Sequence, residues 1–201
     1  MIIFTFFVIL TILYICFDVN YFVRTYFTVL SGRLYQRKYG VNETTHVYGV
    51  CTFQDCDTTL SLRLCRVVRE LDFARYHYYD RTGVYRRSRL LGIRSLQGST
   101  LVRVWGRVPL FQPYKITTKL AYWDKRSFFF EHELITLHDG RVRASLVSRQ
   151  YALSASGDSV EALILGLDGA EVRPECPQYL RCWLDRMELS SKRLRAECDV
   201  K

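Results

Sequence analysis

The chain has 201 residues, of which 49% are hydrophobic and 24% charged, and its formal net charge is +9. This length suits one domain with a sizeable core but not two. The basic residues are scattered along the sequence instead of gathering on one face, which argues against a nucleic-acid-binding protein. Anionic lipid headgroups, or the phosphates of a ligand, account for the same charge.

The amino-terminal segment is the first predicted element. Residues 1–17, MIIFTFFVILTILYICF, carry no charge, and the apolar character continues to Val23 with Asp18 as the interruption. About 20 such residues in a helix can cross the hydrocarbon core of a bilayer. A cleaved signal peptide is the alternative, but the basic residue before the apolar run and the small-residue cleavage site are missing. We therefore expect a single transmembrane anchor over residues 1–23.

The residues after the anchor set the expected topology. Residues 24–45 are predicted to be a juxtamembrane linker, and residues 46–197 the folded domain. Four basic residues follow the anchor, and the positive-inside tendency places the domain in the cytosol, with the endoplasmic reticulum as the expected membrane. These residues are Arg24, Arg33, Arg37 and Lys38.

The cysteines and one sequon point to different compartments. Seven cysteines with no C-x-x-C pair suit a reducing compartment and indicate neither a disulfide framework nor a zinc site. The sequon Asn42-Glu43-Thr44 points to the lumen instead, but so short a motif is common by chance. Use of Asn42 for glycosylation would test the cytosolic placement.

The stretch FQDCDTTLSLRLCRVVRELDFAR, residues 53–75, predicts the helix around which the domain is built. Its apolar residues recur at intervals of three and four, which is the spacing of one stripe of an α-helix. Asp57 or Thr58 is the expected N-cap, and Asp55 a turn residue. The stripe consists of Leu60, Leu64, Val67, Val68, Leu71, Ala74 and Tyr78.

The charged residues of this helix are expected on its solvated face. Glu70 and Asp72 lie three or four residues from arginines, which favours ordinary surface ion pairs. The arginines are Arg66, Arg69 and Arg75.

Strand-like runs joined by short turns surround this helix in the sequence. Short links produce antiparallel neighbours, since a parallel pair needs a long crossover. The fold class is therefore α+β, with an antiparallel sheet wrapped around a long central helix. The predicted strands span residues 46–53, 85–93, 100–108, 116–123, 127–137 and 142–153, and a turn is expected at residues 97–99. Residues 178–195 predict an amphipathic helix that packs on the domain, on a partner chain or, less favoured, on a membrane.

The order of strand, D-x-D, long helix and antiparallel strands resembles the hot-dog thioesterase superfamily. Phe53-Gln-Asp-Cys-Asp57 is similar to the opening of its 4-hydroxybenzoyl-CoA thioesterase branch. Further segments resemble a membrane-anchored member of that superfamily, namely residues 18–24, 69–75, 123–126, 137–140 and 186–191. The resemblance covers nearly the whole chain.

The resemblance implies a function in lipid metabolism. It implies a homodimer, or a homotetramer, that binds an acyl-CoA where the amino end of the central helix faces the thioester, with no cofactor. Asp57 takes the position of the catalytic nucleophile or general base. The amide groups of Thr59, Leu60 and Ser61 are the expected substrate-binding donors.

One departure from the family pattern leaves two hypotheses open. The family's H-x-N-N cluster and its following tyrosine are replaced here by Ser61, Arg63, Leu64 and Val67. The first hypothesis is a membrane-anchored acyl-CoA thioesterase that uses Asp57. The second is a hot-dog protein without hydrolysis that binds acyl groups or acts as a scaffold at a membrane.

The histidines do not offer a metal site. His46, His77, His132 and His138 are dispersed, and no pair has the spacing of metal ligands. Only His132, on a predicted strand between Glu131 and Glu133, is a candidate for a functional role. The run 128–130 of three phenylalanines is expected to pack on both faces of a buried strand.

Overall fold

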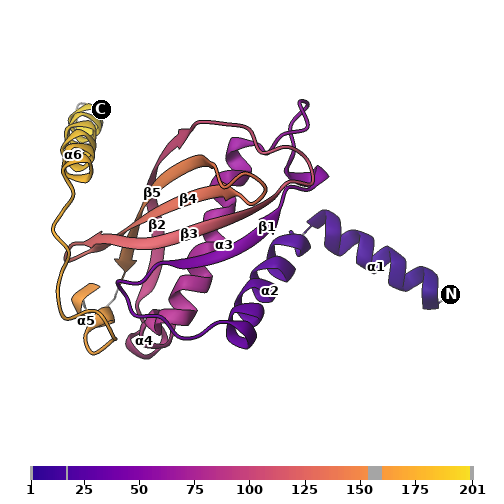
Figure 1. The fold of residues 1–201 in the computed structure, drawn as a ribbon, viewed down its shortest axis with the longest axis horizontal. Helices are drawn as coiled ribbons and strands as arrows, with labels where there is room; N and C mark the ends of the chain where they lie inside the picture. The colour runs from indigo at the N-terminus through magenta and orange to yellow at the C-terminus, as the bar shows by residue number, and fades with distance from the viewer. Residues whose placement is uncertain (1, 17, 154–159, 200–201) are drawn as a thin grey trace.

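The computed structural model describes residues 2–16, 18–153 and 160–199. A five-stranded antiparallel sheet lies along one long helix, α3, which confirms the predicted architecture (Figure 1). The strand order is β1-β3-β4-β5-β2, so that β1 and β2 form the two edges. The strands are β1 (Thr45–Val50), β2 (Arg94–Val104), β3 (Pro113–Trp123), β4 (Ser127–Thr136) and β5 (Val142–Leu153).

The helices lie at both ends of the chain and between the strands β1 and β2. Helix α3 faces the sheet, α2 runs beside α3, and α1 projects away from the body (Figure 1). The helices are α1 (Ile2–Cys16), α2 (Val19–Tyr35), α3 (Leu64–Thr82), α4 (Val84–Leu91), α5 (Val160–Ile164) and α6 (Gln178–Asp199), with a short 3-10 helix η1 (Phe53–Asp55).

The main core lies between α3 and the sheet. Leu71, Ala74 and Tyr78 are almost completely buried there, as predicted, whereas Leu60 and Leu64, the first two residues of the predicted stripe, are each 54% exposed. On the opposite face of the sheet, Phe129 packs with Leu180 of α6. The phenylalanine run therefore packs on both faces of β4, and the first turns of α6 dock on the domain, as predicted.

Two predicted boundaries around α3 and α4 are wrong. Helix α3 begins at Leu64, and its N-cap Arg63 lies six residues after the expected cap Asp57. The segment 85–93, predicted as a strand, forms α4. Gly83 and Gly92 have positive φ angles of 81° and 65°, and this left-handed conformation ends α3 and α4 in turn.

The predicted turn at residues 97–99 lies inside a strand. Strand β2 runs from Arg94 to Val104, and its pairing with β5 shifts register between Gln97 and Ser99. The glycine at this β-bulge leaves room for the ring of Tyr151 on β5, where a Cβ atom would collide. The Gly98 signal therefore marks a close approach of two strands instead of a reversal of the chain.

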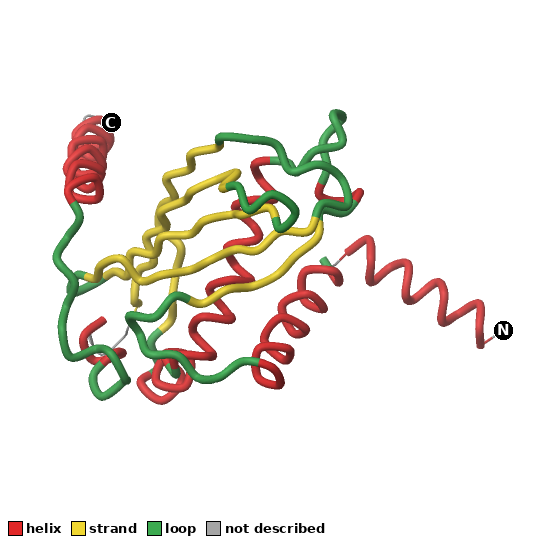
Figure 2. Tube along the Cα trace, in the orientation of Figure 1, coloured by secondary structure: helices red, strands yellow, loops and turns green. Residues whose placement is uncertain are grey.

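The amino-terminal segment differs from the predicted single span over residues 1–23. Helix α1 ends at Cys16, and α2 starts at Val19 with Asp18 as its N-cap, whose side chain accepts a hydrogen bond from the Tyr21 amide at 3.1 Å. Residues 24–35, expected in a linker, belong to α2, which runs along α3 (Figure 2). In the described ranges, none of the helices combines the length and the apolar character needed to cross a membrane.

The contact between α2 and α3 depends on Gly32. A Cβ atom at this position would lie 2.6 Å from the buried ring of His77. Replacing a helical glycine with alanine ordinarily stabilises a protein by up to about 1 kcal/mol. At Gly32 we expect the opposite sign, a loss of about 1–3 kcal/mol, because the clash forces α2 and α3 apart.

Urea denaturation measures this loss as a change in the free energy of unfolding. The matched control is Ser31→Ala, since Ser31 is the neighbouring residue of α2 and is only partly buried. Gly32→Ala as stable as the control would show that α2 is not held against His77.

Candidate functional site

Asp57 lies on the exposed loop that leads into α3. Its Oδ1 atom accepts hydrogen bonds from the hydroxyl and amide of Thr59, at 2.6 and 2.8 Å, and from the Ser61 amide at 3.3 Å. The bond from the Thr59 hydroxyl is the largest of the contributions that lower the Asp57 pKa. All these bonds end on Oδ1, so in the described part of the chain Oδ2 accepts none. The side chain is an oriented, ionised carboxylate with one oxygen available.

The structure brings the predicted site residues Thr59, Leu60 and Ser61 together around Asp57. Their amides are already in use, however, since the Leu60 amide also donates to the Asp57 carbonyl oxygen at 3.1 Å. Leu60 has a positive φ of 52°, which is uncommon for a residue other than glycine. Backbone strain of this kind concentrates at functional sites.

The first turn of α3 offers backbone donors beyond this loop. The N-cap residue Arg63 makes no capping bond to the helix, because a guanidinium has no acceptor for the helix amides; it donates to the Gln54 carbonyl oxygen at 2.7 Å. The Arg66 amide donates to the Arg63 carbonyl oxygen at 2.9 Å, which leaves the amides of Leu64 and Cys65 as the donors without a hydrogen bond in this described turn, at the positive end of the helix dipole. This end of α3 can therefore receive a negatively charged or polarised oxygen.

A pocket of about 120 Å³ lies against the first turn of α3. Its wall is formed by α3, the end of β2 with the loop after it, β4 and β5. The lining residues are Leu62, Leu64, Val67, Val104, Gly106, Val108, Leu134, Arg143 and Ala144. Eight of these nine residues carry no charge, so the pocket suits an apolar group beside the helix amides.

Two arginines lie near the loop and the pocket. Arg107 is close enough to Asp57 to help lower its pKa, after the larger effects of the hydrogen bonds. Arg143 lines the pocket and forms an ion pair with Asp139. Both guanidinium groups therefore lie near a carboxylate, Arg143 near Asp139 and Arg107 near Asp57.

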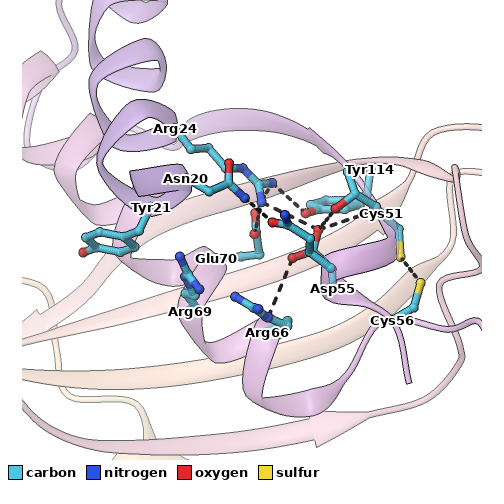
Figure 3. A network of polar contacts seen from close by, with 12 residues as sticks. Asn20, Tyr21, Arg24, Cys51, Asp55, Cys56, Arg66, Arg69, Glu70 and Tyr114 are labelled. Carbon is cyan, nitrogen blue, oxygen red and sulfur yellow. Dashed lines mark hydrogen bonds and ion pairs between the residues drawn. The ribbon is translucent and has the colours of Figure 1, made fainter. Parts of the chain in front are cut away.

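Asp55 is more than the turn residue that the sequence predicts. It is only 4% exposed, and it forms a capping box with Thr52 at the start of η1. Its carboxylate lies 4.0 Å from Arg24 and 3.9 Å from Arg66 (Figure 3). Asp55 therefore fixes the loop, whereas Asp57 points to solvent.

The prediction that Glu70 lies on a solvated face is wrong. Glu70 is 4% exposed, and Arg24 of α2 contacts its two carboxylate oxygens at 2.6 and 2.7 Å (Figure 3). Burial raises the Glu70 pKa to about 7, although the Arg24 charge acts in the opposite direction. Arg24 also donates to the hydroxyl of Tyr114 on β3 at 3.0 Å. The spacing offered one signal, since Glu70 falls between Val67 and Ala74 on the buried stripe.

This polar network joins α2 to the loop that carries Asp57. Asn20 of α2 donates to the Gln54 side chain at 2.7 Å, and Arg24 reaches Asp55 and Glu70 (Figure 3). Sequence reasoning missed the role of Arg24 because it placed this residue in a linker. The position of α2 consequently controls the position of the site loop.

His132 is a structural residue of the sheet. It is fully buried, and its ring nitrogens lie 3.0 Å from the hydroxyls of Thr118 on β3 and Ser148 on β5. Burial lowers the His132 pKa to about 3, so the ring is neutral and holds three strands in register. The Cys51 thiol at the end of β1 is likewise unactivated, because burial raises its pKa to about 12.

The fold and the site together define a class of protein. A sheet of this strand order around one long helix, with an aspartate-bearing loop before that helix, is the hot-dog arrangement. Residues 51–175 match the family model of the Thioesterase-like superfamily, which is more than half of the chain. The chain belongs to this superfamily.

One relative matches almost the full length of the chain. The chain is 46% identical over 191 residues to Protein THEM6 of Drosophila melanogaster, covering 94% of this chain and 97% of that protein. The similarity therefore extends beyond residues 51–175, the part that the family model matches, in both directions along the chain.

Solved structures share the fold. A 1,4-dihydroxy-2-naphthoyl-CoA thioesterase from Synechocystis superposes with a TM-score of 0.53 at 6% identity, covering 62% of this chain and 97% of that chain. The 4-hydroxybenzoyl-CoA thioesterase from Pseudomonas sp. strain CBS-3 gives a TM-score of 0.51 at 17% identity, covering 68% and 96%. At these identities the likeness is one of fold.

Proposed function

We propose that the chain binds acyl-CoA thioesters at the amino end of α3 and hydrolyses them. The observation that carries this proposal is the Asp57 carboxylate, which is held through Oδ1 and leaves Oδ2 available. Proteins of the same fold whose names specify CoA thioesters support the choice of substrate class. The apolar pocket beside α3 suits the acyl group, and the arginines at its mouth suit the phosphates of coenzyme A.

The chemistry follows from these positions. The thioester oxygen meets the amides of Leu64 and Cys65 in the first turn of α3, which stabilise the negative charge that develops on it. Asp57 Oδ2 removes a proton from water, the water oxygen bonds to the carbonyl carbon, and the carbon–sulfur bond breaks to release coenzyme A as the thiolate or thiol. Alternatively, Oδ2 attacks the carbon directly and water hydrolyses the resulting anhydride.

A specific observation favours the second candidate, binding without hydrolysis. Leu64 and Val67, at positions where the family carries an asparagine and a tyrosine, both line the pocket. At these two positions, polar side chains that would place the thioester are replaced by apolar side chains of the pocket lining. If hydrolysis has been lost, this pocket still holds an acyl group, and the protein acts as a binder or scaffold.

We also propose that the chain forms a homodimer or homotetramer. Strand β2 lies at one edge of the sheet, with the large side chains of Leu96 and Leu101 exposed. An unprotected edge strand is a template for pairing with a second copy. Light scattering after size-exclusion chromatography tests this, and a monomeric mass would contradict it.

A further part of the proposal is attachment to a membrane through α1, with the domain on the cytosolic side and the endoplasmic reticulum as the membrane. Helix α1 carries no charged residue, and its described side chains are exposed. Flotation of the full chain with lipid vesicles tests the attachment. Protein that stays at the bottom of the gradient would contradict it.

The acyl pocket gives a separate prediction. Leu64 is 54% exposed and lines the pocket, so Leu64→Gln should weaken acyl contact without disturbing the core. We expect the dissociation constant for a short-chain acyl-CoA to rise about tenfold, which corresponds to ~1.4 kcal/mol of lost apolar contact. Titration calorimetry measures it.

The matched control is Leu90→Gln on α4, because Leu90 is 76% exposed and lies outside this pocket. Equal affinities for Leu64→Gln and this control would place the acyl group elsewhere.

A further inference from the structure

Helix α2 has its polar face inside and its apolar face outside. Arg24, Thr28 and Gly32 face α3, where Arg24 pairs with Glu70 and Gly32 lies against His77. The opposite face exposes large apolar side chains over the length of the helix. They are Phe22 (63% exposed), Val23 (60%), Tyr26 (70%), Phe27 (68%), Leu30 (38%), Leu34 (68%) and Tyr35 (86%).

This orientation is the reverse of the one that water favours. A surface helix of a globular protein turns its apolar stripe to the core and its polar stripe to water. A contiguous apolar patch of this kind marks a surface that something else covers. The patch also continues into a pocket of about 380 Å³ between α2, α3 and α4, whose lining includes Tyr76 and Tyr85.

The neighbouring segments indicate that lipid covers this face. Helix α1, which directly precedes α2, is apolar on all sides, as a helix surrounded by lipid is and a helix on a protein interface is not. At the other end of α2, the exposed Lys38 suits anionic headgroups, while Arg33 is paired with Asp80 and Arg37 with Glu43. Tyrosines such as Tyr26 and Tyr35 favour the boundary between headgroups and acyl chains.

We propose that the outer face of α2 lies in the interfacial layer of a lipid bilayer, parallel to the membrane plane, and holds the folded domain directly against the membrane. This inference deepens the proposed membrane attachment through α1 and rests on it. Interfacial helices of this type bury their apolar face about 5–10 Å into the boundary between headgroups and acyl chains.

The placement has a consequence for the site. The domain is not tethered by a flexible linker, because α2 is both the membrane contact and the support of the loop that carries Asp57. The start of α3 is then held near the lipid surface, where long-chain acyl-CoA partitions. Membrane contact and substrate access are coupled through one helix.

Fluorescence quenching by brominated lipids tests the proposal with the full chain. Phe27→Trp places a tryptophan on the outer face of α2, and Leu189→Trp places one on an exposed position of α6, at the opposite end of the molecule from α1 (Figure 1). Both variants are bound to phosphatidylcholine vesicles containing phosphatidylserine, with and without bromine on the acyl chains. The unmodified chain gives the background from Trp105, Trp123 and Trp183.

We expect the emission of the tryptophan at position 27 to shift to shorter wavelength and to be quenched by bromine, and that at position 189 to do neither. A chain that floats with the vesicles but shows no quenching at position 27 would overturn the proposal while leaving attachment through α1 intact. A blue shift without quenching would mean that a second copy of the chain covers α2, and would also overturn it. A chain that does not float would contradict the proposed attachment itself.

Discussion

Replacing Arg24 with methionine should lower the free energy of unfolding by about 3–5 kcal/mol at pH 8. Arg24 is the partner of Glu70, which is 4% exposed and lies in the contact between α2 and α3. Removing one member of a buried ion pair leaves the other as an uncompensated charge, which is the costly case. The Arg24→Met variant should also detach α2, because the same guanidinium contacts Tyr114 and Asp55.

The loss of unfolding free energy caused by Arg24→Met should be smaller at pH 5 than at pH 8. The direction of this change follows from the Glu70 pKa. Burial raises this pKa from 4.5 to about 7 in the folded protein, so the folded state binds more protons than the unfolded state between these values. The stability that Glu70 contributes is therefore fully present below pH 4.5 and is lost as the pH rises through 7. Without Arg24 the Glu70 carboxyl is protonated even more readily, so at pH 5 Glu70 no longer carries an unpaired charge.

Urea denaturation at the two pH values checks this prediction. Lys192→Met on α6 is the control, because Lys192 contacts Glu188 at 3.9 Å on the exposed surface, and such pairs contribute about 1 kcal/mol or less. An Arg24→Met loss equal to that of the control, or unchanged between pH 8 and pH 5, would contradict a buried pair.

Asp57→Asn should reduce acyl-CoA hydrolysis by about 100-fold or more, the usual scale for a lost acid or base. Asparagine keeps the oxygen that accepts the bonds from Thr59 and Ser61, so the loop should keep its shape. The second oxygen of the carboxylate is replaced by an uncharged NH2 group, which cannot take a proton from water or attack the thioester. Release of free coenzyme A measures the rate, and calorimetric binding of the same acyl-CoA should change little.

Asp185→Asn is a matched control, since Asp185 is an exposed aspartate on α6, away from the loop. Asp55→Asn distinguishes the roles of the two aspartates in the D-x-D motif. We expect it to lower the stability of the protein, because Asp55 contacts two arginines. Equal rates for Asp57→Asn and the unmodified protein would remove Asp57 from catalysis. Binding without turnover in the unmodified protein would support the acyl-binding alternative.

The elements with a clear period were predictable from the sequence. The stripe from Val67 to Tyr78 and the runs of β3, β4 and β5 came out almost as the structure has them, because burial on one face imposes their spacing. The resemblance added the hot-dog arrangement, which the matches to family and fold support.

The errors have separate physical causes. Tyr85 and its neighbours were predicted to form a strand because aromatic and branched residues favour strands. They form a short helix instead, bounded by the left-handed glycines at positions 83 and 92. Asp57 was predicted to cap the helix because a short carboxylate side chain can accept hydrogen bonds from backbone amides. It does accept such bonds, but from the amides of its own turn. Helix α2 could not be recognised, because its apolar face points outward and its polar face meets partners distant in the sequence.

The location of the acyl group is the claim on which the proposed function depends most directly. A short-chain acyl-CoA with a photoreactive diazirine on its acyl group can be crosslinked to the full chain and the attachment site mapped by mass spectrometry. We predict labelling within residues 62–67 or 104–108, which line the pocket beside α3, and competition by unlabelled acyl-CoA. Competed labelling confined to other segments, or no competed labelling at all, would contradict an acyl site at the start of α3.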